Sequence, residues 1–403
     1  MTAKTGPLAG VKVVELAHVM AGPVCGLMLA DMGADVIKVE KLPGGDDTRR
    51  FLPPDIGGES AAYMMMNRNK RGIAVDLKNP DGRDCVLTLL KTADVVIENY
   101  RAGTMERLGL GYEALKKDNP GIIYCEISGF GRSGPYKDRG GYDLIAQGMS
   151  GLMSITGEGP GRELVKVGAP MTDITAGILG ATGVLAAYIH KLKTGEGQRV
   201  DTSLFEAGIT HTYWQSAIAF ATGIAPGPMG SAHPLNAPYQ AFETLDGWIT
   251  LGAANQTNWL RMLNVIGRPD LGNDARYLDS QMRMENRPAL SQTLSGIFRT
   301  KSKSDWLARL EEAGVPAGPV LNVKEMHEDP HAIARDMIVT HEHKKAGSVN
   351  SIGCPIKFSE TQASVDCGAP VYGEHTREVL MEYGYTPEAI DALVQSQAIA
   401  VEN

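Results

Sequence analysis

VKVVELAHVMAGPVCGLMLADMGADVIKVEK (11–41) decides the fold, because two runs rich in Val and Ile flank a pattern typical of a helix. The runs Val11–Leu16 and Asp35–Val39 have the composition of strands that are buried on both faces of a parallel sheet. Between them, Pro23 suits the first turn of a helix and Gly33 is placed to end it. The stretch therefore predicts a strand, a helix and a second strand.

The same alternation continues along the chain beyond this unit. Further strands are predicted at Ile73–Leu77, Val95–Glu98 and Ile122–Ile127, and helices are predicted to open at Asn79-Pro80 and at Thr104. Strands that alternate with helices predict an α/β fold with a doubly wound parallel sheet. Ligands of such sheets bind beyond the carboxyl ends of the strands.

The second half of the chain has a different organisation. Residues 141–222 are predicted to be mostly helical, with one long helix from about Met171 to Lys193. The Pro- and Gly-rich stretch 223–234 is a candidate domain boundary, and 314–320 is a second break. Between them, a β-hairpin is expected around Leu245-Asp246-Gly247. A chain of 403 residues also exceeds what one hydrophobic core usually organises.

Composition narrows the class of protein. The net charge of −8, with both signs mixed along the chain, argues against a nucleic-acid partner. No apolar run approaches the ~20 residues of a membrane span, and the N-terminal residues lack the apolar core of a secretory signal. The five cysteines are far apart and form no C-x-x-C pair. We expect a cytoplasmic chain with reduced thiols, no membrane partner and no metal site.

Two short motifs point to other functions but lack their structural context, and a third motif is absent. Gly129–Gly134 matches a dinucleotide fingerprint, but the residues after it are typical of a loop rather than of the helix that the pyrophosphate needs. His341 and His343 have no third metal ligand nearby. The G-x-S-x-G motif of serine hydrolases is absent. A nicotinamide oxidoreductase is therefore a weaker hypothesis.

The stretch VKVGAPMTDITAGILGATGVLAAYIHKL (165–192) is the most informative about chemistry. It predicts a buried helix of small and apolar residues that begins after Pro170 and carries Asp173 in its first turn. Free backbone N–H groups and the helix dipole favour an anion there. Asp173 could simply cap the helix, although Thr172 or Thr175 could serve as well.

Ten motifs, in order along nearly the whole chain, make the sequence resemble the class III coenzyme A (CoA) transferases. This family includes formyl-CoA transferase, carnitine CoA-transferases and α-methylacyl-CoA racemase. The motifs are GVKVVELAHVMAGP, LADMGADVIKVEKLPGGDDTR, NRNKRGIAVDLK, ADVVIENYRAGTMERLGLGY, GRSGPYKDRGGYDLIAQGMSGLM, GAPMTDITAGILGATGVLAAY, TGEGQRVDTSLFEA, PYQAFETLDGWI, GVPAGPV and GEHTREVL.

The resemblance implies an architecture. It is an α/β fold with a Rossmann-like large domain, whose parallel sheet is built from both chain ends (1–228 and 326–403). A smaller inserted α+β domain would cover 229–325, and two copies would form an interlocked homodimer.

The resemblance also implies a chemistry. Asp173 would attack an acyl thioester, giving an acyl-aspartyl anhydride and then an aspartyl-CoA thioester. CoA and acyl-CoA would be substrates, with no permanently bound cofactor. The CoA-contacting positions that carry over are His18, Val19, Lys41, Val75, Asn99, Tyr100, Arg107 and Tyr142.

One departure from the family pattern bears on the type of reaction, and two segments bear on the substrate. Tyr142 stands where the racemases have their His, and Tyr is a poor base near neutral pH. An acyl-CoA racemase is therefore the weaker hypothesis and is kept as the alternative function. A protein that binds CoA without turnover is a second alternative. The PYQAF segment and DGWITLGAANQTNW look closest to the dicarboxylate branch, which includes the succinate–hydroxymethylglutarate transferases. We expect a donor such as succinyl-CoA, whose distal carboxylate Arg49, Arg50 or His233 could hold.

Overall fold

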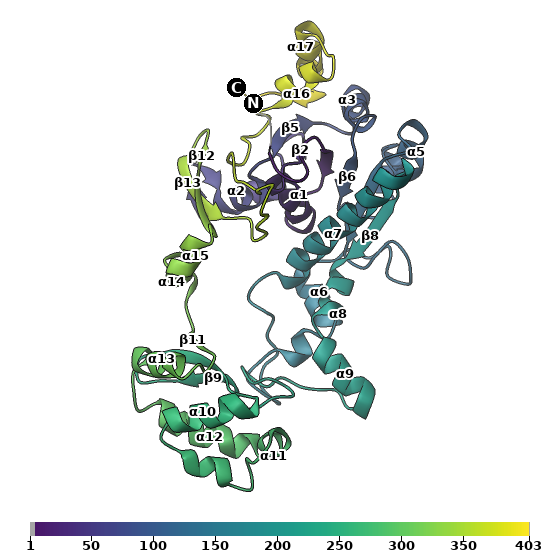
Figure 1. The fold of residues 1–403 in the computed structure, drawn as a ribbon. Coiled ribbons are helices and arrows are strands. Elements are labelled where there is room, and N and C mark those ends of the chain that lie inside the picture. The colour runs from purple at the N-terminus through teal and green to yellow at the C-terminus, as the bar shows by residue number, and fades with distance from the viewer. Residues whose placement is uncertain (1–4, 403) are drawn as a thin grey trace. The chain divides into compact units, whose positions relative to one another are not determined.

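The computed structural model describes residues 5–402, which divide into two compact units (Figure 1). Unit 1 contains the chain up to Gly151, Val167–His211 and the chain from Pro330 onward. Unit 2 contains Leu152–Lys166 and Thr212–Asp329. The domain boundaries expected from the sequence, near 228 and 326, stay a prediction; the compact units also place residues 152–166 and 212–228 with unit 2.

A seven-stranded sheet forms the centre of unit 1, in the order β14-β5-β2-β1-β6-β7-β8. Its strands are β1 (Lys12–Leu16), β2 (Asp35–Lys41), β5 (Arg71–Val75), β6 (Val95–Glu98), β7 (Ile123–Ser128), β8 (Arg199–Ser203) and β14 (Ile399–Ala400). The five strands predicted up to residue 127 are confirmed, within two residues at each end. The sheet is parallel except for β14, which pairs antiparallel with β5. The predicted parallel sheet is therefore confirmed for six strands, and the edge strand β14 is the exception.

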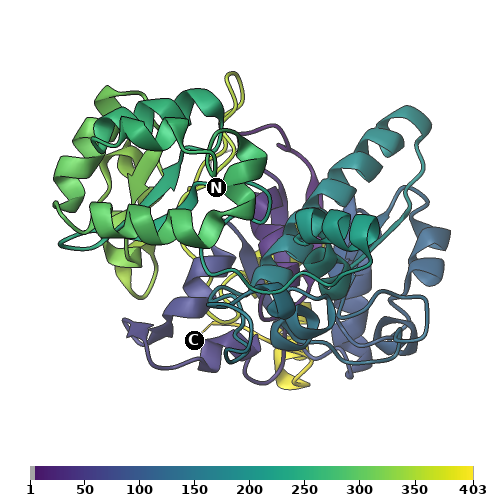
Figure 2. The same cartoon turned by 90° about the horizontal axis from the view of Figure 1, so that it is seen from below.

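Helices cover both faces of this sheet (Figure 2). One face packs against α1 (Ala21–Asp31), α6 (Asp143–Met149), α7 (Met171–Thr194) and α8 (Leu204–Thr210). The other face packs against α3 (Pro80–Leu90), α4 (Thr104–Arg107), α5 (Tyr112–Asp118), α16 (Thr376–Glu382) and α17 (Pro387–Gln395). Unit 1 also contains η1 (Asp47–Arg50), β3 (Asp55–Ile56), β4 (Glu59–Ser60), α2 (Ala61–Asn67), α15 (Pro330–Ala334), β12 (Ile338–His343) and β13 (Gly347–Ile352).

Local helix signals are confirmed where they were predicted. The Asn79 side chain caps α3 by accepting from the backbone N–H of Asp81, and Pro80 follows at the first helical position. Gly33 has φ of 98° just after α1, a conformation that glycine adopts at little cost. The fingerprint-like Gly129–Gly134 lies in a loop with no helix opening there, as expected.

Glycines in α7 let it pack directly on α1. A side chain at Gly177 would place its Cβ 2.7 Å from the Ala21 carbonyl oxygen, and one at Gly180 would meet the Cys25 sulfur at 3.4 Å. Because Gly177 faces the first turn of α1 and Gly180 faces a later residue, the two helices run in the same direction. Their N-terminal ends therefore lie side by side, at the carboxyl edge of the sheet.

Unit 2 is a smaller α+β unit with its own core. Its three-stranded sheet has the order β11-β10-β9, and the predicted hairpin is confirmed as β9 and β10. The core gathers around Trp259, Phe298 and Trp306. The elements are η2 (Met153–Ile155), α9 (Tyr213–Thr222), β9 (Tyr239–Glu243), β10 (Trp248–Gly252), α10 (Gln256–Val265), η3 (Pro269–Asn273), α11 (Ser280–Glu285), α12 (Arg287–Phe298), α13 (Lys303–Glu312), β11 (Ala317–Pro319) and α14 (Val323–His327).

Two general features bear on function. Within residues 5–402, one helix, α7, is long and apolar enough to cross a membrane by length and composition alone, and the core helices of soluble proteins pass the same test. Over the same range, His341 and His343 belong to no group of three or more potential metal ligands.

Candidate active site

The carboxyl edge of the unit 1 sheet has its switch point at β1. Strands β2 and β5 extend the sheet on one side of β1, and β6, β7 and β8 extend it on the other. The loops that follow β1 and β6 therefore diverge at this point, which is where open α/β sheets bind their ligands. Four of the predicted CoA-contacting residues, His18, Val19, Asn99 and Tyr100, lie on these two loops.

The segment after β1 is held by side chains from neighbouring strands. The Lys38 ammonium donates to the Ala17 carbonyl oxygen at 2.8 Å. The Asn99 amide bonds both backbone groups of His18, accepting from its N–H at 3.0 Å and donating to its carbonyl oxygen at 2.8 Å. The Asp46 carboxylate accepts from the Val19 N–H at 3.1 Å. Every polar backbone group from the Ala17 carbonyl to the Val19 N–H is thus bonded.

Val19 itself has a strained backbone. Its φ of 66° is rare for a β-branched residue, and strain of this kind persists only where the surroundings impose it. The bonds from Asn99 and Asp46 supply that constraint on both sides of the residue. The segment is therefore pre-shaped, as a ligand-binding backbone would be.

Buried charges support this segment from below. Lys38 contacts Glu15 and Asp46 at 2.9 Å each, and Lys70 contacts Glu15 at 2.8 Å. Burial opposes the charge of Asp46, but Lys38 and the bonds from Thr48 outweigh it and hold the pKa of Asp46 below its ordinary value. Burial opposes the charge of Lys38 too, yet Glu15 and Asp46 hold its pKa above the ordinary value. Asp46 is therefore an ionised acceptor for Val19.

The remaining predicted residues near this segment differ in exposure. The rings of His18 and Tyr100 lie 5.6 Å apart. Burial lowers the pKa of His18, with Asp46 acting in the opposite direction. Lys41, at the end of β2, is half-exposed and pairs with Asp47 at 2.6 Å. Together with Val19 and Asn99, these residues lie at one edge of the sheet.

Three predicted CoA-contacting residues differ from this group in where their side chains lie, although the Val75 backbone pairs with Lys41 between β5 and β2. The Val75 side chain is fully buried in the core, so only its backbone can face a ligand. Arg107 is exposed on α4 and donates to the Thr104 hydroxyl at 3.0 Å. Tyr142 is exposed at the residue before α6. Their predicted roles stay predictions.

Sequence reasoning missed two cations beside α4. Arg101 and Lys137 line a cavity of about 190 Å³ next to Gly103 and Met105, whose wall also carries two further cations and four carboxylates, from Arg132, Arg199, Glu98, Glu106, Glu126 and Asp138. The Arg101 and Lys137 side chains are candidates for phosphate contacts. Lys137 lies in the RSGPYKDR segment, which the sequence predicts to be a loop.

Asp173 lies in the first turn of α7, as predicted. Its side chain is half-buried, and among residues 5–402 no hydrogen bond or ion pair engages its carboxylate. Burial, with a smaller contribution from the charge of Asp143, raises the pKa of Asp173 to about 7. Because α7 runs parallel to α1, this carboxylate lies at the end of α7 that adjoins the start of α1, which follows the Val19 segment. A carboxylate held partly desolvated and without a partner suits a nucleophile better than a helix cap.

Asp143 anchors the start of α7. Its carboxylate accepts from the Thr172 N–H at 2.9 Å and hydroxyl at 2.7 Å, and from the Gln147 amide at 2.7 Å. Gln147 in turn accepts from the Val167 N–H at 2.9 Å. Since Pro170 offers no side-chain cap, Asp143 takes the capping role from a different helix.

The sequence of the chain matches a known protein family. A sequence profile of CoA-transferase family III matches residues 8–376. The chain belongs to CoA-transferase family III. The family prediction is confirmed, and the chain is a CoA-transferase.

Similar proteins indicate which branch of the family the chain resembles. A succinate–glutarate CoA-transferase of Agrobacterium fabrum is 41% identical over 93% of this chain and 95% of its own length. A succinyl-CoA:mesaconate CoA-transferase of Haloarcula hispanica is 39% identical over 94% of this chain and 97% of its own. A CaiB/BaiF family protein from Brucella suis has the same fold, with a TM-score of 0.84 and 39% identity over 94% of this chain and all of its own. The predicted resemblance to the dicarboxylate branch is confirmed.

The predicted ligands for a distal carboxylate differ in availability. Arg49 of this CoA-transferase binds Glu40 through two bonds of 2.7 Å and stacks on the Tyr63 ring, with its charged group 3.7 Å from the ring centre. Its side chain is only 10% exposed, so it is a structural residue. Arg50 is exposed and pairs with Asp47. His233 belongs to unit 2, where it stacks on Tyr239.

Replacing Asp143 with Asn tests how the charge of Asp143 affects the pKa of Asp173. We expect the midpoint of the pH profile for acyl transfer to the enzyme to fall below the value near 7 set by Asp173, because a negative charge that raises this pKa is removed. A carboxyl group attacks only in its ionised form, so if Asp173 is acylated the variant should gain relative rate on the acid side. Single-turnover rates between pH 5 and 9 measure this. Asp84→Asn, an exposed change on α3, is the matched control, and coincident midpoints in both variants would refute the coupling.

Proposed function

We propose that this CoA-transferase moves CoA from a dicarboxylyl-CoA donor to a carboxylic acid through covalent intermediates on Asp173. The observation that carries the proposal is the unpartnered, half-buried Asp173 carboxylate with a pKa raised to about 7. Such a group is partly ionised at neutral pH and little stabilised by its surroundings, which favours nucleophilic attack.

The proposed steps conserve the energy of the thioester. An Asp173 oxygen attacks the thioester carbonyl carbon, the C–S bond breaks, and a mixed anhydride and CoA thiolate form. The thiolate then attacks the Asp173 carbonyl carbon, releasing the donor acid and leaving an aspartyl-CoA thioester. The acceptor carboxylate attacks that thioester, the C–S bond breaks, and a second anhydride and CoA thiolate form. The thiolate finally attacks the acceptor's acyl carbon, which yields the product and regenerates the Asp173 carboxylate.

The site suits this sequence of steps in two ways. The close packing of α7 on α1 at Gly177 and Gly180, just beyond Asp173, limits the space for water, which would hydrolyse either intermediate. The bonded Ala17–Val19 segment, with Lys41, Asn99 and Tyr100 beside it, supplies a firm surface for CoA at the carboxyl edge of the sheet. Val75, Arg107 and Tyr142 would extend this surface.

The donor we propose is succinyl-CoA or another dicarboxylyl-CoA. Support comes from relatives whose names pair succinate or succinyl-CoA with glutarate and mesaconate. Because these two relatives differ in their second acid at nearly equal identity to this chain, the acceptor is left open. A cytoplasmic location remains part of the proposal.

Mass spectrometry after incubation with succinyl-CoA and hydroxylamine tests the function. We expect a hydroxamate on the peptide that contains Asp173, because hydroxylamine captures activated carboxyl groups. A panel of acyl-CoA donors that leaves no adduct would contradict the mechanism. Deuterium uptake at the α-carbon without an acceptor acid would instead favour the racemase alternative.

We also propose that the enzyme forms a homodimer, interlocked as the family resemblance implies. The long apolar helix α7 leaves Ile189 and Leu192 exposed, and α9 leaves Phe220 89% exposed, which a second copy would cover. Light scattering should give twice the chain mass of 43.1 kDa. Ile189→Lys with Leu192→Lys should lower the mass, whereas Lys193→Ala on the same helix should not. A wild-type mass of one chain would exclude the dimer.

A further inference from the structure

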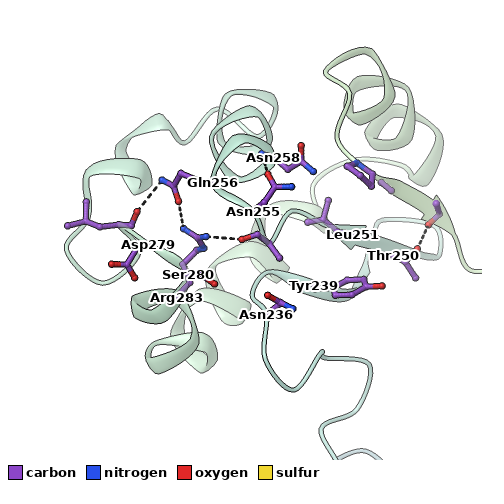
Figure 3. Close-up of a pocket in the computed structure, with 16 residues that line it drawn as sticks. Asn236, Tyr239, Thr250, Leu251, Asn255, Gln256, Asn258, Asp279, Ser280 and Arg283 are labelled. Atoms are coloured by element: carbon purple, nitrogen blue, oxygen red, sulfur yellow. Dashed lines mark hydrogen bonds between the residues drawn. The ribbon is translucent and has the colours of Figure 1, made fainter. Parts of the chain in front are cut away.

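Unit 2 contains a cavity of about 1170 Å³ that the proposed chemistry does not use. It is bounded by β9, β10 and β11, by the start of α10 and by the start of α11 (Figure 3). Its wall is mostly apolar, with groups from Leu251, Leu278, Pro316 and Ala317, but it also carries the amide and hydroxyl groups of Asn236, Tyr239, Thr250, Asn255, Asn258 and Ser280. A largely apolar wall with a few polar groups is typical of sites for small molecules.

Arg283 brings a buried positive charge to the cavity. Its side chain is fully buried, and its guanidinium donates to the carbonyl oxygens of Ala237 at 3.0 Å and Ala254 at 2.9 Å. It also donates to the Gln256 amide oxygen at 2.8 Å, as Figure 3 shows, and to the Tyr277 carbonyl oxygen at 3.2 Å. These bonds use four of the five N–H donors of a guanidinium. One donor on Nη2 is left.

Within residues 5–402 no carboxylate forms an ion pair with Arg283. The nearest acid on its own helix segment is Asp279, which lines the cavity, but its carboxylate caps α11 by accepting from the Met282 N–H at 2.8 Å. Buried charges in proteins are normally paired, so a buried guanidinium held only by neutral acceptors is unusual. The positive charge of Arg283 therefore attracts an anion that enters the adjoining cavity.

Two further groups at the cavity have unused hydrogen-bonding capacity. The Asn255 side chain accepts from the Asn258 N–H at 2.8 Å through its oxygen, which leaves its NH₂ group for a ligand. The Asn258 side chain and the Tyr239 hydroxyl take part in no hydrogen bond with residues 5–402. These groups line the same cavity as Arg283.

We propose that this cavity binds a small organic acid, whose carboxylate is attracted by the Arg283 charge and held by the Asn255 and Asn258 amides. A single cation matches one carboxylate, and Asp279 at the wall opposes a polyanion such as a nucleotide phosphate chain. The volume leaves room for the rest of the acid. This binding does not depend on Asp173, so it stands or falls separately from the covalent mechanism.

Titration calorimetry of the full chain with glutarate, without CoA, tests the site. We expect saturable binding that Asn258→Leu weakens at least about fivefold, the loss of one hydrogen bond to a charged group. Asn264→Leu, an exposed change on the same helix outside the cavity, should leave binding unchanged. Neutral glutaramide should bind at least about tenfold more weakly than glutarate, since a charge-assisted bond is lost.

Arg283→Met should abolish binding if the variant keeps its fold, which circular dichroism checks. If Arg283→Met unfolds, the affinities of Asn258→Leu and Asn264→Leu for glutarate still test the proposal. Equal affinities in those two variants, or no binding by the wild type, would overturn the proposal. A change of molecular mass in Asn258→Leu would also overturn it, because the cavity would then be covered by a second copy.

Discussion

Replacing Asp173 with Asn is expected to lower the rate of CoA transfer at least about 10³-fold, because the nucleophile of the proposed mechanism is removed. An amide cannot form an anhydride with the acyl group, and no other carboxylate has the same position. Asp143, the nearest acid, is engaged by Thr172 and Gln147. Steady-state transfer from succinyl-CoA to glutarate, followed by chromatography of the CoA esters, measures the effect.

Binding separates this prediction from a general loss of structure. Asn has nearly the shape of Asp, and the Asp173 side chain bonds to no other residue between 5 and 402, so the affinity for acyl-CoA should stay within about threefold of the wild type. Asp84→Asn should transfer CoA at the wild-type rate. If Asp173→Asn kept a tenth of the wild-type rate, with no hydroxamate on its peptide, Asp173 would not be the nucleophile.

The parts of the fold that were predicted are those with strong local signals. Strands β1, β2, β5, β6 and β7 are almost wholly buried, so they appear as runs of Val and Ile. Strand β8 was missed because its first three residues are not buried, and Arg199 and Asp201 interrupt any apolar run. Strand β14 has two residues and pairs with a strand more than 300 residues earlier.

The residues of the candidate site, too, could be predicted only where the local sequence gives a signal. Asp173 could be found because a carboxylate in an apolar helix is unusual by itself. The roles of Asp46 and Asp143 could not be found, since each acts on a segment far away in the sequence: Asp46 on Val19 and Asp143 on Thr172. Lys38 appears in the sequence as an ordinary charge beside Lys41, although Lys38 is fully buried and Lys41 is not. Only the fold distinguishes them.

Replacing Lys38 with Met is expected to lower the free energy of unfolding by about 3–5 kcal/mol, the usual loss when one partner of a buried ion pair is removed. Lys38 lies between Glu15 and Asp46, all three with at most 1% side-chain exposure. Without it, Asp46 becomes a buried carboxylate with no cationic partner, and its bond to the strained Val19 weakens. Urea denaturation followed by circular dichroism measures the stability.

Lys41→Met is the matched control, because Lys41 is on the same strand but its side chain is 51% exposed. An exposed pair contributes about 0–1 kcal/mol, so this variant should unfold almost like the wild type. The two variants should differ in function as well. Lys41→Met should raise the KM for acyl-CoA if Lys41 contacts the CoA phosphates, whereas Lys38→Met should lower kcat by loosening the Val19 segment. Equal stabilities would mean that the buried charges do not support that segment.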